Sequence, residues 1–154
     1  MAMIQRRSVL LAAGSIWALT AAGAQAAKKL SIKVYKDPSC GCCTAWADRL
    51  TAAGFDVSVE ERDDMDALKN QLGVPGDLVS CHTGVVAGYA IEGHVPPADI
   101  KKLVSGKSKA KGLAVPGMPI NSPGMEVPSE PDEAYTVWLF QKDGTRAAFA
   151  HHGG

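Results

Sequence analysis

The chain has 154 residues, with 16 basic and 16 acidic side chains and a formal net charge of zero. This length suits a single globular domain with a hydrophobic core. If the first 26 residues are removed, Arg6 and Arg7 are lost, so 16 less 2 leaves 14 basic residues against 16 acidic ones. A net charge near −2 gives no electrostatic reason to expect binding to nucleic acid or to an anionic membrane.

Residues 1–26 have the pattern of an export signal. A short basic start precedes an apolar run over residues 8–22, and Ala24-Gln25-Ala26 forms a small-x-small cleavage pattern. The apolar run is too short for a membrane span. The pair Arg6-Arg7 resembles a twin-arginine signal, and an ordinary secretory signal is the alternative. We therefore expect a periplasmic protein, cleaved near Ala26, whose mature domain covers residues 27–154 and has no membrane span.

The first half of the mature chain alternates between strand and helix patterns. Residues 30–35 alternate apolar and polar side chains, which is typical of a half-buried strand. Over residues 43–54 apolar side chains recur at the spacing of a helix face: Cys43, Trp46, Ala47 and Leu50. Residues 55–59 predict a second strand, and residues 63–73 predict a helix that begins at two aspartates and ends at a glycine.

The second half begins with a pair of strands. Residues 83–87 form an apolar run suited to a central strand, Gly88 allows a bend, and residues 89–92 predict an antiparallel neighbour. Pro96 and Pro97 are expected to begin a third helix.

The C-terminal third predicts a long irregular segment followed by a hairpin. Residues 106–131 are rich in Gly, Pro, Ser and Lys, without a periodic pattern. Residues 135–140 and 145–150 predict two strands joined by a turn at Asp143-Gly144. The whole order, β-α-β-α-β-β-α, places a cysteine pair where the first strand meets the first helix. We therefore predict an α/β fold, a thioredoxin-like sheet flanked by helices with an added C-terminal β-hairpin.

Three of the four cysteines, Cys40, Cys42 and Cys43, fall within four positions, and the fourth, Cys81, is followed by His82. Exported proteins meet an oxidising environment, where four cysteines would by default form two disulfides. Cys42 and Cys43 are adjacent, however, and Cys40-Gly41-Cys42 is very tight. A bridge across such short loops is strained and gains little from the cross-link. A disulfide staple is therefore a poor explanation for the cluster, and redox chemistry or soft-metal binding is the better one.

The Cys-x-x-Cys pair by itself favours redox chemistry, whereas two further features favour a metal site. Cys40 and Cys43 have the Cys-x-x-Cys spacing at the start of a helix, which favours a thiol–disulfide oxidoreductase with a low-pKa nucleophile at Cys40. A third thiol at Cys42, however, would give competing mixed disulfides in such an enzyme. The segment before the third strand also has Cys81-His82 where thioredoxin-like redox proteins carry a cis-proline. Both features favour a metal site, and we assign no catalytic residue.

The type of ligand limits which metals the site can bind. Thiolates select Cu(I), Zn(II) or iron–sulfur clusters. The side chains of adjacent residues such as Cys42 and Cys43 tend to diverge, which suits a polynuclear cluster better than one tetrahedral ion. Copper is the soft metal most expected in an exported bacterial protein. An iron–sulfur electron carrier and a zinc-stabilised structural module are the alternatives.

Four motifs occur together along the mature chain: Cys40-Gly41-Cys42-Cys43, Ser80-Cys81-His82-Thr83, Glu92-Gly93-His94-Val95-Pro96, and Gly-Leu-Ala-Val-Pro-Gly-Met-Pro at residues 112–119. They resemble a family of small exported metal-binding proteins that includes the CopG copper-resistance proteins. The resemblance covers roughly residues 30–149. It implies a thioredoxin-like fold, a multinuclear thiolate-bound Cu(I) cluster, and a role in periplasmic copper resistance that includes switching between Cu(I) and Cu(II).

The resemblance also implies the ligands, which would be Cys40, Cys42, Cys43 and Cys81. Four further candidates have the right chemistry: His82, His94, Met118 and Met125. Imidazoles and thioethers both suit copper, although a structural role is the alternative for each of the four. The expected partners are metal ions and other periplasmic copper-handling proteins.

Overall fold

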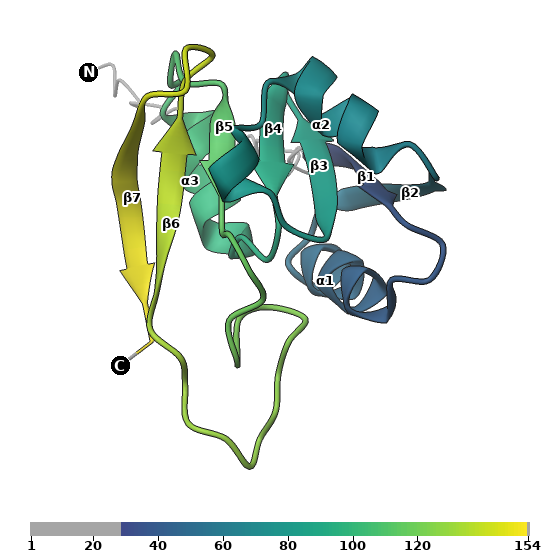
Figure 1. The fold of residues 1–154 in the computed structure, drawn as a ribbon. Coiled ribbons are helices and arrows are strands. Elements are labelled where there is room, and N and C mark those ends of the chain that lie inside the picture. Colours follow the sequence, from purple (N-terminus) through teal and green to yellow (C-terminus); the bar gives the residue numbers. More distant parts are fainter. Residues whose placement is uncertain (1–28, 154) are drawn as a thin grey trace, which may run out of the picture.

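A seven-stranded mixed sheet organises the structure, a computed structural model that describes residues 29–153 (Figure 1). The predicted export signal lies outside the described residues. In chain order the elements are β1 (Ser31–Lys36), α1 (Gly41–Ala52), β2 (Asp56–Glu61), α2 (Met65–Leu72), the short 3-10 helix η1 (Gly76–Leu78), β3 (His82–Val86), β4 (Tyr89–Glu92), α3 (Pro97–Ser105), β5 (Gly112–Ala114), β6 (Tyr135–Phe140) and β7 (Arg146–His152).

The strands lie in the order β2-β1-β3-β4-β5-β6-β7. The β1–β2 and β4–β5 pairs are parallel, and the other four pairs are antiparallel. The β6–β7 hairpin therefore forms one edge of the sheet and β2 forms the other (Figure 1). The predicted mixed α/β class is confirmed, and so is the extension of the sheet by the C-terminal hairpin.

Two apolar clusters lie on opposite faces of this sheet. Successive strand residues point to opposite faces, so Ile91 and Leu113 join one cluster while Ala90 and Ala114 join the other. The first cluster includes buried side chains of α1 and α3, and the second includes Leu72 of α2. Helices α1 and α3 thus cover one face, and α2 with η1 covers the other.

The buried face of α1 is the one that the helical spacing of apolar residues predicts. Its buried side chains are Cys43, Trp46, Ala47 and Leu50. The indole Nε1 of Trp46 donates a hydrogen bond of 3.0 Å to the carbonyl oxygen of Val95, which satisfies the polar atom of a fully buried ring. Helix α1 is therefore fixed both to the sheet and to the loop that precedes α3.

Two elements differ from the sequence prediction. The segment at residues 106–131 contains a short strand, β5, that has no alternating pattern; it forms because its backbone pairs with β4 on one side and β6 on the other. In β2 the side chain of Val59 is 49% exposed, and this strand lies at the edge of the sheet. Among residues 29–153, no helix is both long enough and apolar enough to cross a membrane.

Candidate metal centre

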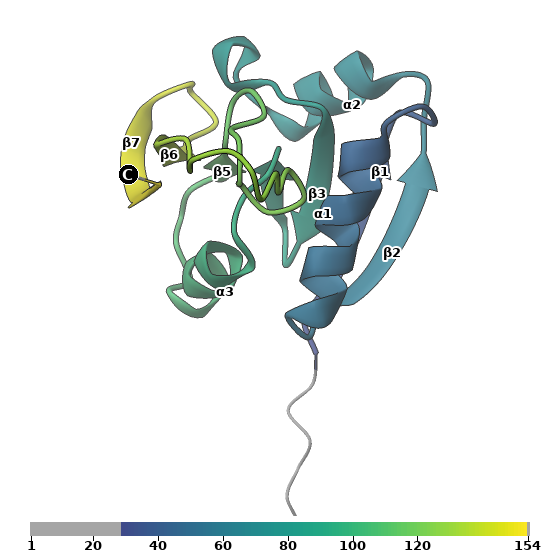
Figure 2. The same cartoon turned by 90° about the horizontal axis from the view of Figure 1, so that it is seen from below.

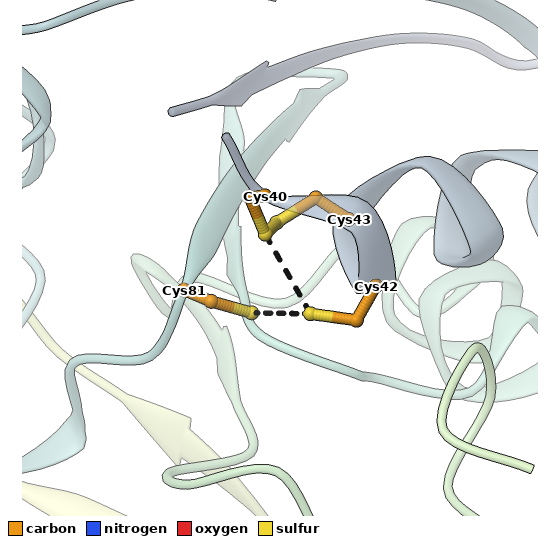
Figure 3. Close-up of side chains that lie close together, drawn as sticks. All are labelled: Cys40, Cys42, Cys43 and Cys81. Carbon is orange, nitrogen blue, oxygen red and sulfur yellow. Dashed lines mark hydrogen bonds between the residues drawn. A yellow bond between two sulfur atoms is a disulfide. The ribbon is translucent and has the colours of Figure 1, made fainter. Parts of the chain in front are cut away.

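The first turn of α1 carries three of the four cysteines. A turn ahead of the helix is held by Asp37, whose Oδ1 accepts the backbone N–H of Ser39 at 2.8 Å and whose carbonyl accepts the N–H of Cys40 at 3.0 Å. Cys40 is the N-cap residue of α1. Cys43, one turn later, lies on the buried face, while Cys42 points toward β3 (Figure 3).

The four cysteine sulfurs lie within 4.8 Å of one another. The Sγ of Cys42 is 3.6 Å from the Sγ of Cys40 and 3.8 Å from that of Cys81, which approaches from the start of β3 (Figure 3). The structure thus brings together residues that are 39 positions apart, as the motif comparison predicts.

Cys40 and Cys43 are joined by a disulfide, whereas Cys42 and Cys81 are free thiols. The bridge joins the Cys-x-x-Cys pair of the oxidoreductase alternative, and not the adjacent cysteines or the Cys40-Gly41-Cys42 loop in which strain is expected. The Cα atoms of Cys40 and Cys43 are 5.6 Å apart, which is the usual separation for a disulfide. Residues three positions apart on a helical turn reach this separation, although adjacent ones do not.

The alternation of β3 directs His82 toward the cysteines. His82 lies on the α1 face, with its ring centroid 4.3 Å from that of Trp46. Its Nδ1 is 3.1 Å from the Sγ of Cys81. Its Nε2 is buried and has no hydrogen-bond partner among the described residues, so this ring has an unused nitrogen inside the site.

His94 completes a second group around Cys81. Its Nδ1 lies 2.9 Å from the carbonyl oxygen of Pro123; because a carbonyl only accepts, Nδ1 carries the hydrogen. The unprotonated Nε2 then points at the Sγ of Cys81 from 3.3 Å. Outer hydrogen bonds of this kind orient metal-ligating histidines. Cys81, His82 and His94 thus form a Cys–His–His set that shares Cys81 with the four-sulfur set.

Burial sets the protonation of these groups. It is the largest cause that lowers the pKa of both His82 and His94, which keeps both imidazoles neutral and able to bind a metal. Burial, followed by the neighbouring Cys42, raises the pKa of Cys81 to about 12. Cys81 therefore keeps its proton at neutral pH, and a bound metal would replace that proton.

A buried ion pair supports the Cys81 loop from the opposite face of the sheet. The Glu92 carboxylate accepts hydrogen bonds from Lys69 Nζ at 2.5 Å, Thr83 Oγ1 at 2.5 Å and the Ser80 backbone N–H at 2.7 Å. Burial raises the pKa of Glu92, and the Lys69 ammonium opposes that rise. The two residues that flank Cys81-His82 are thus both tied to one carboxylate.

Sequence reasoning missed this network. A signal was present, because Glu92 shares a strand face with Ala90 and is therefore an acidic group at a covered position. Its partner Lys69 lies next to Leu68 on α2, where no periodicity marks it as buried. Only the packing of α2 on the sheet brings the ammonium to the carboxylate.

The two methionine candidates lie in different surroundings. The Sδ of Met118 is 4.0 Å from the Sγ of Cys42, and its side chain is exposed. Among the described contacts, the sulfur of Met125 has none with a cysteine or histidine of the site. Met125 instead holds the loop through its backbone, which donates to Ser122 O and accepts from Asn121 N. The structure therefore places Met118, but not Met125, at the four-sulfur set.

Comparison with solved structures gives two strong matches, described as copper resistance protein CopG form 1 and form 2. The first is 45% identical, covers 82% of this chain and 100% of the matched chain, and has a TM-score of 0.78. The chain belongs to the CopG family. The second CopG structure is also 45% identical, covers 81% of this chain and 99% of its own, and has a TM-score of 0.77.

A family model described as "Protein of unknown function, DUF411" matches residues 78–125. This span contains Cys81, His82 and His94 together with both methionine candidates, so it covers the part of the site outside α1. The search of curated proteins gave no match. The resemblance to the CopG family that the sequence motifs indicate is therefore confirmed by structure and by identity.

Proposed function

We propose that this protein is an exported copper-binding protein that holds Cu(I) in a thiolate-rich site and contributes to copper resistance. The observation that carries the proposal is the gathering of four cysteine sulfurs within 4.8 Å. Both matched CopG structures are described as copper resistance proteins. The periplasm is the proposed location, consistent with the signal pattern at residues 1–26.

The donor set supports copper over harder metals. Thiolates and thioethers are soft ligands that favour Cu(I), and the cysteines are accompanied by Met118 and by two neutral imidazoles, His82 and His94. We propose Cys40, Cys42, Cys43 and Cys81 as the core ligands. When Cys40 and Cys43 are reduced, four sulfurs within 4.8 Å of one another suit a cluster with bridging thiolates, so the proposed site is polynuclear.

The strand order supports a thioredoxin-like assignment for the first part of the fold. In β2-β1-β3-β4 the first two strands are parallel and the last two pairs are antiparallel, with α1 and α3 on one face and α2 on the other. We propose that β5, β6 and β7 are an addition to this thioredoxin-like unit. The site would then occupy the place where α1 begins.

Anaerobic titration of the fully reduced protein with Cu(I) tests the proposal. We expect more than one Cu(I) to bind per chain, and the Cys42→Ser variant to lose most of this capacity, because Cys42 is the sulfur in contact with both Cys40 and Cys81. Copper per chain is measured by metal analysis after gel filtration, with a parallel titration using Zn(II).

Thr44→Ser is the matched control, since Thr44 is exposed on the same helical turn and carries no sulfur. It should bind copper as the unaltered chain does. A capacity of one Cu(I) or less, or a Cys42→Ser variant with full capacity, would contradict the polynuclear thiolate site. Tight binding of zinc alone would indicate a structural zinc site.

The Cys40–Cys43 disulfide favours a second candidate function, thiol–disulfide exchange. Cys40 is half-exposed and Cys43 is buried, which suits a nucleophile and a resolving thiol respectively. This candidate requires metal-independent reduction of insulin by the reduced protein. It also requires that Cys42→Ser keep this activity, so the same variant separates the two functions.

A further inference from the structure

The segment between β5 and β6 lies beside α1 (Figure 2). The pairs that meet are Met118 with Cys42, Gly124 with the backbone of Trp46, and Glu126 with Arg49. On α1 these positions have the spacing i, i+4 and i+7, which places them along one face of a helix. The helix that carries three of the cysteines is therefore held alongside the loop whose backbone contacts His94.

Glu126 has a different partner for each of its carboxylate oxygens. Its Oε1 lies 2.7 Å from Nε of Arg49, and its Oε2 accepts the backbone N–H of Gly124 at 3.0 Å. The side chains of the ion pair are 55% exposed at Arg49 and 37% exposed at Glu126, so the pair by itself adds little to the stability of the fold. The effect of Glu126 depends instead on the peptide group that its second oxygen holds.

The peptide group held by Glu126 is also the one that orients His94. The Pro123 carbonyl and the Gly124 N–H belong to one planar trans unit and point in opposite directions. Glu126 accepts the N–H on one side, and His94 Nδ1 lies 2.9 Å from the carbonyl oxygen on the other. Neither group can rotate without the other, so the carboxylate fixes the acceptor that decides which nitrogen of His94 carries the hydrogen.

We propose that Glu126 is a positioning residue of the metal centre, which holds the Pro123–Gly124 peptide so that Nε2 of His94 stays unprotonated and directed at the metal. This Nε2 lies 3.3 Å from the Sγ of Cys81, so the fixed tautomer presents its lone pair to a metal bound at that sulfur. Because His94 has no exposed surface, bulk water cannot replace the carbonyl as its partner. The inference rests on the proposed function, namely that copper binds at these groups.

Three variants separate the two contacts of the carboxylate. Glu126→Ala removes both. Glu126→Gln keeps an amide oxygen that can accept the Gly124 N–H but removes the charge that pairs with Arg49. Arg49→Ala removes the ion pair and leaves the hydrogen bond to Gly124 in place. A role in orienting His94 therefore predicts a large effect for the first variant and small effects for the other two.

The experiment measures the His94 tautomer and the copper affinity in the same set of variants. Nitrogen NMR of isotopically labelled, reduced, metal-free protein above neutral pH reports which imidazole nitrogen carries the hydrogen. The His94 signals are those absent from the spectrum of His94→Gln. Cu(I) affinity is measured anaerobically by competition with a chromogenic chelator, and urea denaturation of each variant reports whether it is folded.

Glu126→Ala should change His94 from the Nδ1–H tautomer to a mixture and weaken Cu(I) affinity about tenfold, as loss of an outer hydrogen bond does at metal sites. Glu126→Gln and Arg49→Ala should keep the tautomer and lose affinity at most a few-fold. Glu60→Ala is the matched control, because Glu60 is 40% exposed and pairs with Lys33 at 2.6 Å. It should change neither the tautomer nor the affinity.

A Glu126→Ala variant that leaves either the tautomer or the affinity unchanged would overturn the inference. A Glu60→Ala variant that loses as much affinity would also overturn it, since the effect would then be one of surface charge alone. The mixed tautomer in Glu126→Gln would contradict it as well, because the amide oxygen should still hold Gly124. If the unaltered chain does not bind Cu(I), the proposed function fails, whereas the tautomer still decides whether Glu126 orients His94.

Discussion

The candidate metal centre draws its side chains from segments far apart in the sequence, whereas the β6–β7 hairpin is made within residues 135–152. At the site, Glu92 and His94 have no exposed surface, and each is hydrogen-bonded to other protein groups, Glu92 to Lys69 and His94 to the Pro123 carbonyl. In the hairpin, most of the β7 side chains are exposed to solvent. Removing one partner of a buried hydrogen bond or ion pair leaves the other partner buried and unpaired. Equivalent substitutions should therefore lower the free energy of unfolding far more at the site than in the hairpin.

The largest expected effect is that of Glu92→Ala. This change leaves the Lys69 ammonium buried without its carboxylate and removes the acceptor of the Ser80 N–H. We expect the free energy of unfolding to fall by about 3–5 kcal/mol, measured by urea denaturation of the metal-free protein. Binding of Cu(I) by the folded fraction should weaken as well, because the loop carrying Cys81 loses its support.

Arg146→Ala is the matched control in the hairpin. Arg146 pairs with Asp77 at the surface, where their side chains are 42% and 60% exposed, and its loss should cost about 0.2–1 kcal/mol. Equal costs for the two variants would show that burial does not separate the regions as the structure indicates.

A pair of glycine substitutions isolates the packing of the loop against α1. Gly124 and Gly144 have similar positive φ angles, +88° and +83°, so an alanine meets similar backbone strain at each. A Cβ at Gly124 would lie 2.6 Å from the backbone nitrogen of Trp46, whereas a Cβ at Gly144 meets nothing within 4 Å.

Gly144→Ala should therefore cost about 1 kcal/mol, and Gly124→Ala should cost at least twice as much in denaturation experiments. Only Gly124→Ala should also weaken Cu(I) binding, because the adjacent Pro123 carbonyl orients His94. A loop that moves freely away from α1 would make the two costs equal.

The smallest effect is expected from the methionines. Met118→Leu removes the thioether beside Cys42 and should weaken Cu(I) affinity a few-fold, since a thioether is a weak ligand. Met125→Leu, in the same loop, should leave the affinity unchanged. Competition with a Cu(I) chelator measures both, and a larger loss for Met125→Leu would reverse the assignment.

Local patterns predicted the parts of the fold that local physics controls. The buried face of α1 follows from helical spacing, and β4 and β6 have the predicted bounds, residues 89–92 and 135–140. Strand β5 escaped prediction because its three residues are stabilised by neighbours on both sides. Within the hairpin, β7 runs to His152, two residues beyond the predicted end, because pairing with β6 continues there.

The sequence alone determined which chemistry is available, because thiols, imidazoles and thioethers at their spacings already indicated a soft-metal site and the CopG family. Only the tertiary structure decided which of these groups form a disulfide, which stay free and which face one another. It pairs Cys40 with Cys43, leaves Cys42 facing Cys81, and orients His94 through a carbonyl 29 residues away. It also buries Lys69 against Glu92 beneath the loop. The reason is physical: apart from the Cys40–Cys43 disulfide, these contacts join residues distant in sequence. Their contribution to the free energy exists only when the sheet, α1 and α2 exclude water around them.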